Sequence, residues 1–234
     1  MFFIPYGARE ATRRQRFPYV TYLLLGANVA VFLLQLYLIF AWGEIGLQRF
    51  IDMFAVVPAD ITDGTPLELS LITAMFLHSG LLHIAGNMLY LLPFGDNVED
   101  RLGHGRYILF YLLCGIAASL THVAFEPHSF IPALGASGAI AGVLAGYLAL
   151  HPRGVVKGFL FIFIILLRVD LPAVVFVGFW FVLQLFSGVA ALGNPATAGG
   201  VAFMAHVGGF VGGLVLAPLF AATNRKWRNV PVVS

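Results

Sequence analysis

Long apolar runs follow one another along the chain and are separated by short polar stretches. Six of them approach the length of about 20 apolar residues that a helix needs to cross a bilayer, and they lie at about 19–42, 71–93, 106–125, 136–151, 171–191 and 200–221. A seventh, GFLFIFIILL at 158–167, is shorter and is closely followed by Arg168, Asp170 and Pro172. Such a short run is more typical of an interfacial or re-entrant segment. The pattern therefore predicts six membrane-spanning helices.

The distribution of charge supports six spans and predicts their orientation. Six spans place twelve of the thirteen Lys and Arg residues on one side, including both terminal segments. The other side keeps Arg49 and the acids Glu44, Asp52, Asp60, Asp63, Glu68 and Glu126. Because basic loops stay in the cytoplasm, both termini are expected there. A span at 158–167 would move the basic C-terminal segment to the opposite side.

Composition places the chain among membrane proteins and narrows its partners. Hydrophobic residues make up 60% of the chain and charged residues 10%, whereas a soluble domain carries about 25% charge. A net charge of +2 without a basic run does not favour nucleic acid. We expect an all-α membrane protein with a six-span domain at 19–222, a cytoplasmic segment at 1–18 and a cytoplasmic tail at 223–234. The segment at about 43–70 suits an amphipathic helix at the outer interface.

Polar side chains within the predicted spans gather near one leaflet. The second span carries His78, His83 and Asn87, the fourth begins near Ser137, and the sixth carries His206. Even-numbered spans run in the same direction, so these residues come to a similar depth. Polar groups inside a membrane are costly and are functional candidates by default.

Glycines are spaced so that the fourth and sixth spans can pack closely. Gly138, Gly142 and Gly146 recur every four residues on one, and Gly209 and Gly213 on the other. Small residues at this spacing let helix backbones approach in lipid. The pattern predicts that the serine and the histidine meet.

A serine hydroxyl becomes a nucleophile when a nearby base takes its proton, and His206 can be that base. The backbone N–H groups at the start of the fourth span, with His83 and Asn87, are candidate donors to an oxyanion. No carboxylate is expected at the depth of His206, so a Ser/His dyad is the natural interpretation.

Simpler interpretations exist for each residue. A lone serine in a span usually packs or bonds to its own helix. GASGA is not a G-x-S-x-G nucleophile elbow, since residue 139 is alanine. His78 and His83 are five residues apart, with no Cys or carboxylate beside them, so no metal or other cofactor is predicted. Ordinary interfacial or packing positions are expected for His104, His122, His128, His151 and, unless it is a gate residue, Trp180.

In combination, HIAGNM with His83 and Asn87, GASG with Ser137, and AHVGGFVGG with His206 resemble the rhomboid family of intramembrane serine proteases. The motifs occur in family order over about 19–222, and FGDNVEDRLGHGRY is similar to the family's short cytoplasmic turn. The resemblance implies a six-helix rhomboid bundle that cuts transmembrane substrates near their outer ends.

The resemblance also implies roles for individual residues. Ser137 is the nucleophile and His206 the general base, while His83, Asn87 and the Ser137 backbone N–H form the oxyanion hole. His78 lines the cavity that supplies water. The fifth span and outer loop are candidates for a substrate gate.

Two features depart from the family pattern. Some members have a tyrosine that stacks on the histidine, and here Ala141 occupies that position, so something else must hold His206. The outer loop also lacks the Trp-Arg pair of some members.

Two other functions are open at this point. One is a catalytically silent rhomboid-like protein that binds membrane clients, although such relatives lose the serine or histidine. The other is a small transporter or channel, which would place ionisable residues at several depths. The expected partners are transmembrane substrates and lipid, and the absence of a recognisable signal or transit peptide favours a bacterial plasma membrane.

Overall fold

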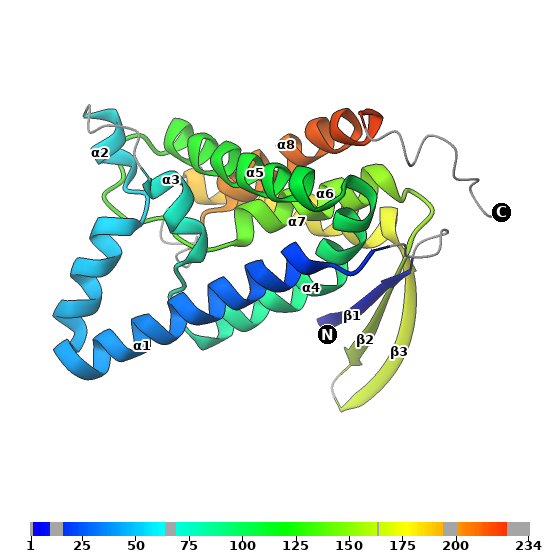
Figure 1. The fold of residues 1–234 in the computed structure, drawn as a ribbon, viewed down its shortest axis with the longest axis horizontal. Helices are drawn as coiled ribbons and strands as arrows, with labels where there is room; N and C mark the ends of the chain where they lie inside the picture. The colour runs from blue at the N-terminus through cyan, green and yellow to red at the C-terminus, as the bar shows by residue number, and fades with distance from the viewer. Residues whose placement is uncertain (1, 10–15, 64–68, 163, 194–200, 224–234) are drawn as a thin grey trace.

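A computed structural model describes residues 2–9, 16–63, 69–162, 164–193 and 201–223. The elements in chain order are β1 Phe2–Arg9, α1 Tyr19–Phe54, α2 Pro58–Thr62, α3 Ser70–Thr73, the 3-10 helix η1 Ala74–Phe76, α4 Leu81–Leu102, α5 His104–Phe125, α6 Ser137–Leu150, β2 Val155–Ile162, β3 Ile165–Pro172, α7 Ala173–Gly193 and α8 Phe203–Ala222. The helices lie side by side as a bundle, with the short helices α2 and α3 at one end and the sheet near the other (Figure 1).

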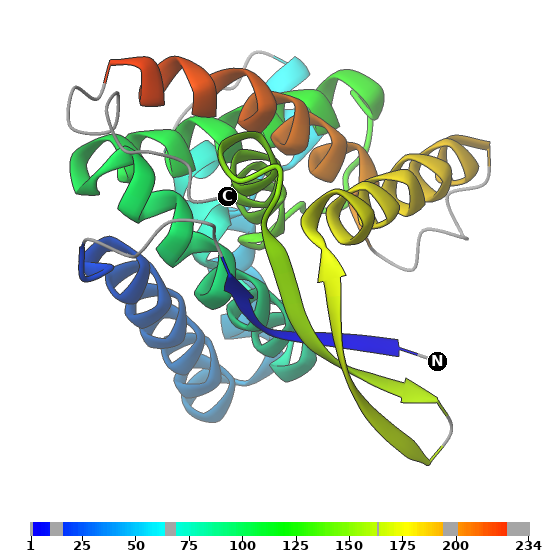
Figure 2. The ribbon, with the colours of Figure 1, turned by 90° about the vertical axis from the view of Figure 1, so that its right-hand side faces the viewer.

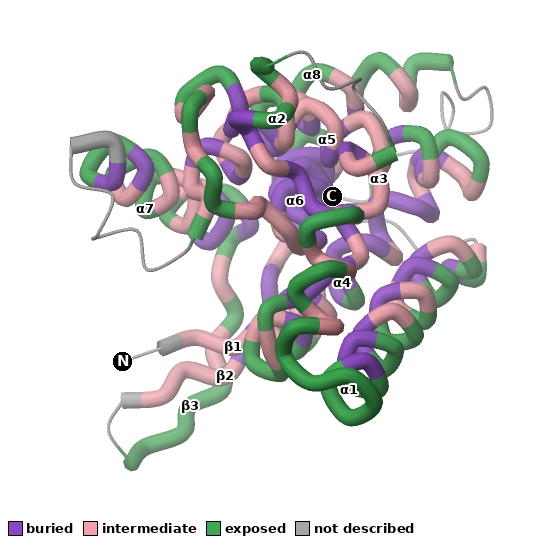
Figure 3. The backbone as a smooth tube through the Cα atoms, turned by 90° about the vertical axis from the view of Figure 1, so that its left-hand side faces the viewer, coloured by how far each residue is buried: buried purple, intermediate pink, exposed green. Residues whose placement is uncertain are grey.

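Helix α6 is the centre of the bundle. It contacts α4, α5, α7 and α8, which surround it when the molecule is viewed from the sheet end (Figure 2). Every residue from Gly138 to Tyr147 is buried, and α6 forms the dark centre of Figure 3. Its 14 residues extend over about 21 Å at 1.5 Å per residue, less than the hydrocarbon thickness of a bilayer. A helix this short is tolerated because the surrounding helices, and not lipid, cover it.

The apolar helices fit a multi-pass membrane protein. Within the described residues, α1, α5, α7 and α8 are long and apolar enough to cross a bilayer, and the bent pair α3–η1 and α4 gives up to five spans. Their positions match five of the six predicted runs, and α6 matches the remaining one.

Helix α1 extends beyond the predicted span. Gly43 has φ 66°, a conformation that favours glycine, and the helix changes direction there before it continues to Phe54. Part of the predicted interfacial helix at 43–70 is therefore the second limb of α1, followed by α2.

The second predicted span is broken near its N-terminal end. The axes of Ser70–Phe76 and Leu81–Leu102 differ by 96°, so His78 lies in a loop. Gln35 of α1 holds this loop, because its side chain accepts a hydrogen bond from the His78 N–H at 3.0 Å and donates one to the His78 carbonyl at 3.0 Å. The interruption places His78 and His83 on different backbone segments.

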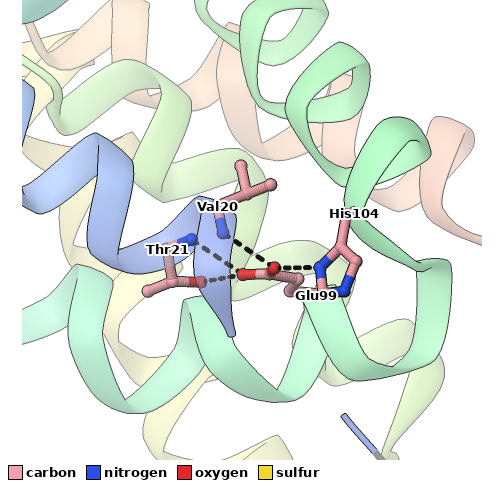
Figure 4. Close-up of polar contacts among 4 residues, drawn as sticks. All are labelled: Val20, Thr21, Glu99 and His104. Carbon is pink, nitrogen blue, oxygen red and sulfur yellow. Dashed lines mark hydrogen bonds and ion pairs between the residues drawn. The ribbon is translucent and has the colours of Figure 1, made fainter. Parts of the chain in front are cut away.

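Helix α4 continues through part of the segment that was expected to be a turn. Its acidic residue Glu99 is fully buried and accepts hydrogen bonds from the N–H groups of Val20 and Thr21 at 2.9 and 2.7 Å, from the Thr21 hydroxyl at 2.7 Å, and pairs with His104 Nδ1 at 2.6 Å (Figure 4). A carboxylate at a helix N-terminus accepts hydrogen bonds from the free N–H groups of the first turn and interacts favourably with the helix dipole. Glu99 therefore joins the starts of α1 and α5 to the end of α4.

The fold is predominantly helical, as predicted, but it is not all-α. Strands β1, β2 and β3 form an antiparallel sheet in the order β1-β2-β3, and the apolar run at 158–167 lies in the β2–β3 hairpin. Phe3 of β1 packs its ring 5.1 Å from Phe176 of α7. Nine of the ten residues at 158–167 have apolar side chains, so the segment lacks the apolar–polar alternation of a half-buried strand. For this reason the sequence pattern did not predict a sheet.

Candidate active site

Ser137 is the first residue of α6 and follows a strained turn. Gly135 has φ 122°, which a side chain would disfavour. The turn is fixed to its surroundings, because the Gly135 N–H donates to the Ala74 carbonyl at 2.8 Å, and Val56 and Ala133 exchange backbone hydrogen bonds at 3.0 and 2.7 Å. This support holds the hydroxyl at the N-terminus of the central helix.

The structure brings Ser137 and His206 together. The serine Oγ lies 2.8 Å from Nε2 of His206, and His206 is 8% exposed. At this distance a neutral Nε2 accepts the hydroxyl proton, which is the geometry that activates a serine.

Close glycine packing makes this contact possible. A Cβ on Gly209 would collide with the carbonyl oxygen of Gly138, and a Cβ on Gly213 would collide with that of Gly142. These positions confirm the predicted approach of the two helices. Gly146, the third glycine of the fourth predicted span, faces Phe110 and Ala217.

The other nitrogen of His206 contacts an amide. Nδ1 lies 2.7 Å from Oε1 of Gln184 on α7, and since an amide oxygen accepts, Nδ1 carries the proton and leaves Nε2 free to act as a base. The rings of Trp180 and Phe203 lie 5.9 and 6.4 Å from the imidazole. Gln184 and these aromatic rings hold His206 where Ala141 offers no tyrosine.

Gln184 was not among the residues predicted from the sequence. It is the one amide side chain in FWFVLQLF at 179–186. Because polar groups are costly to bury in lipid, a polar residue in this apolar span could have identified it as a functional candidate. Its position on the helix face toward His206 follows from the structure.

His83 and Asn87 lie beside the turn that precedes Ser137. A Cβ on Gly135 would come 2.8 Å from Nε2 of His83 and 3.8 Å from Nδ2 of Asn87. The Ser79 N–H donates to His83 Nδ1 at 3.3 Å, so the proton of the neutral ring is on Nε2. The buried Asn87 Nδ2 has no partner among the described residues. Two side-chain donors therefore lie close to the start of α6.

His78 lies behind His83, with the two ring centroids 5.0 Å apart in an edge arrangement. The His78 side chain is 2% exposed, and neither ring nitrogen has a hydrogen-bond partner in the described part of the chain. It therefore lies next to His83, one of the two candidate donors. Within the described residues no three His, Cys, Asp or Glu side chains gather as metal ligands do.

A small cavity opens beside Ser137, between the turn at 133–136 and the helices α5, α6 and α8. Ser119 and His122 of α5 form part of its wall together with small residues that include Gly115 and Ala205. His122 is 5% exposed, so it is a buried ionisable side chain in the wall of this cavity. The apolar character of α5 obscured this residue, although an ionisable side chain in a span was again the available signal.

Sequence comparison matches residues 68–223, two thirds of the chain, to the model of the Rhomboid domain. The chain belongs to the rhomboid family. It is 31% identical over 202 residues to the rhomboid protease GluP of Bacillus subtilis, an alignment that covers 86% of this chain and 34% of that protein. It is 30% identical over 214 residues to the mitochondrial rhomboid protein 1 of Saccharomyces cerevisiae, with coverage of 90% and 56%.

The rhomboid relatives differ in activity and location. This chain spans about a third of GluP and just over half of the yeast protein. A shorter match, 33% identical over 91 residues, covers 38% of this chain and 6% of an inactive rhomboid protein from Drosophila melanogaster. Membership in the family therefore leaves the activity to be argued from the site, and the mitochondrial relatives do not support the expected bacterial plasma membrane.

Proposed function

We propose that this chain is an intramembrane serine endopeptidase that hydrolyses peptide bonds in or next to transmembrane segments. The observation that carries the proposal is the 2.8 Å contact between Ser137 Oγ and His206 Nε2 in the interior of the helix bundle. Ser137 attacks the substrate carbonyl, and His206 takes its proton and then gives it to the leaving amine. In the second step His206 takes a proton from water, the resulting hydroxide attacks the acyl-enzyme, and the proton returns to the Ser137 hydroxyl.

Negative charge develops on the substrate carbonyl oxygen during attack. His83, Asn87 and the backbone N–H of Ser137 are the donors proposed to receive it, since donors already aimed at an oxyanion stabilise the transition state without reorganisation. This role is supported by Asn87 Nδ2, which has no hydrogen-bond partner in the part of the chain that the structure describes. His78 has the proposed role of lining the path by which water reaches the acyl-enzyme.

The proposed catalytic domain comprises 19–222 as six membrane crossings, namely α1, the broken α3–α4 unit, α5, α6, α7 and α8. Both termini are proposed to lie on the cytoplasmic side, as the basic residues favour, with 1–18 and 223–234 as flanking segments.

Substrates are proposed to enter past α7. A peptide bond in a helix is shielded by the helix's own hydrogen bonds, so a substrate has to unwind where it meets the serine. Of the four long apolar helices, α7 has the smallest buried share, 22%, and it carries Gln184. Movement of α7 would open the bundle to a substrate helix.

The test is cleavage of a single-span model substrate by the purified protein in liposomes. Wild type is expected to cut within or beside the substrate's span, and Ser137→Ala and His206→Ala are expected to fall to background while their thermal unfolding stays close to that of wild type. Ser187→Ala and His128→Ala serve as matched controls that retain cleavage. An inactive wild type, or a folded Ser137→Ala that still cuts, would contradict the proposal and favour a client-binding rhomboid.

A further inference from the structure

The β2–β3 hairpin has a different character at its base and at its tip. Opposed residues in an antiparallel pair share a face, and neighbours along a strand alternate. At the base, Lys157 is opposite Asp170 and Arg168 is opposite Phe159, which gives one polar face. The other face there includes Val156, which is 0% exposed beneath the helices. The base is thus an ordinary sheet, apolar toward the protein and polar away from it.

The tip is apolar on both faces. FLFIFIILL at 159–167 has no polar side chain, and in the described parts of β2 and β3 successive residues point to opposite sides of the hairpin. Ile164 is 99% exposed, Leu166 52% and Leu167 44%. Strands that are apolar on both faces are normally buried on both faces, so an apolar medium is expected to cover this tip.

The base of the hairpin leads directly into α7, whose first turn is apolar and exposed. Strand β3 ends at Pro172 and α7 begins at Ala173, with Val174 and Val175 exposed at 56% and 53% on the first turn. Figures 1 and 2 show that the hairpin leaves the bundle sideways, so its tip lies beside the helices. This direction carries the apolar tip along the membrane.

The hairpin base carries the charges that suit a lipid surface. Arg153 and Arg168 are exposed and Lys157 is partly exposed there, with Asp170 as the opposing acid. Basic side chains near a bilayer are attracted to anionic headgroups. We propose that the 159–167 tip inserts into the interface of the bilayer, with the basic base at the headgroups, and so fixes the starting point of α7.

The depth of insertion follows from the backbone. Strand β3 is an edge strand, with β2 on one side and, among the described residues, no strand on the other. Free backbone N–H and C=O groups are not tolerated in hydrocarbon but are satisfied by water and headgroups. The hairpin is thus an interfacial anchor and not a membrane span.

A fluorescent label at the tip tests this proposal. In a Cys114→Ala background, an environment-sensitive dye on Ile164→Cys is compared with the same dye on Gly105→Cys, an exposed position in the first turn of α5 with open space around it. Both proteins are placed in vesicles of phosphatidylcholine and phosphatidylglycerol, with or without a spin-labelled lipid whose quencher lies just below the headgroups. The tip dye is expected to emit at shorter wavelength and to be quenched severalfold more strongly than the control.

Two other results would overturn the inference. Emission at the solvent-exposed wavelength with no quenching would show that the tip lies in water. Emission at shorter wavelength without lipid quenching would show that protein covers the tip, as pairing of two β3 edges between copies of the chain would produce.

Discussion

At the scale of single residues, the proposed dyad depends on which nitrogen of His206 carries the proton. Gln184 accepts from Nδ1 at 2.7 Å and Ser137 lies 2.8 Å from Nε2. An amide gives no charge to stabilise an imidazolium, as a carboxylate would, but it selects the tautomer. The same neutral group is less costly to bury within α7 than a carboxylate.

Removal of the amide tests this positioning role. Gln184→Ala is expected to lower kcat about tenfold or more, the equivalent of one hydrogen bond lost from a buried site, with little change in KM. Gln184→Glu, which restores an acceptor, is expected to recover part of the rate and to shift its pH profile. Ser187→Ala, one turn away on the same helix, is the control. A kcat within twofold of wild type for Gln184→Ala would remove the tautomer argument.

Asn87 tests the proposed oxyanion hole. Its Nδ2 has no other hydrogen bond to lose among the described residues, so Asn87→Ala is expected to lower kcat by about 10²–10³ and to leave thermal stability nearly unchanged. Asn97→Ala, on the same helix but bonded to the Pro93 carbonyl at 2.8 Å, is the comparison that affects stability instead. Unchanged kcat in Asn87→Ala would exclude the donor role.

At the scale of elements, the contact between α6 and α8 sets the geometry of the dyad. Gly209 and Gly213 face backbone carbonyls of Gly138 and Gly142, so a methyl group has nowhere to go unless the helices separate. The serine and histidine are carried on these same two helices, and their separation is therefore coupled to this packing.

Gly209→Ala is expected to destabilise the protein by about 1–3 kcal/mol, as overpacking does, and to reduce cleavage by lengthening the Ser137–His206 contact. Gly26→Ala on α1, where an added Cβ meets nothing within 4 Å, is the matched control and is expected to be neutral or stabilising. Thermal unfolding in detergent with parallel cleavage assays provides both readouts. Equal stability of the two variants would show that the helices do not pack as described.

The elements also show where sequence reasoning succeeded and failed. Ser137, His206 and the glycine ladder were predictable because polar groups and regularly spaced glycines stand out against an apolar background. The end of α4 was not predictable, because its charged residues suggested an exposed turn. Glu99 is buried there, and it accepts hydrogen bonds from backbone N–H groups of α1. The hairpin escaped prediction because its tip lacks the alternating pattern that identifies strands.

At the scale of the whole molecule, the proposed topology puts the sheet and the active site on opposite sides of the membrane. The turn between α4 and α5 lies toward the sheet end, and α2 lies at the other end (Figure 1). Twelve of thirteen basic residues fall on the sheet side under six crossings, which is the arrangement the positive-inside rule favours.

Labelling of introduced cysteines tests this arrangement. In intact cells or oriented vesicles, a membrane-impermeant maleimide applied outside is expected to modify Asp60→Cys on α2 and to spare Gly105→Cys until the membrane is opened. Both positions are exposed, so exposure does not separate them. Equal labelling of the two from outside would contradict six crossings with both termini in the cytoplasm.

The central claim is that Ser137 is a nucleophile activated by His206, and covalent labelling tests it most directly. A fluorophosphonate probe is applied to the reconstituted protein, and the modified residue is located by mass spectrometry of its peptides. The account predicts modification of Ser137, with loss of labelling in His206→Ala and retention in His128→Ala. A folded wild type that takes up no probe, or takes it up at another serine, would contradict the account.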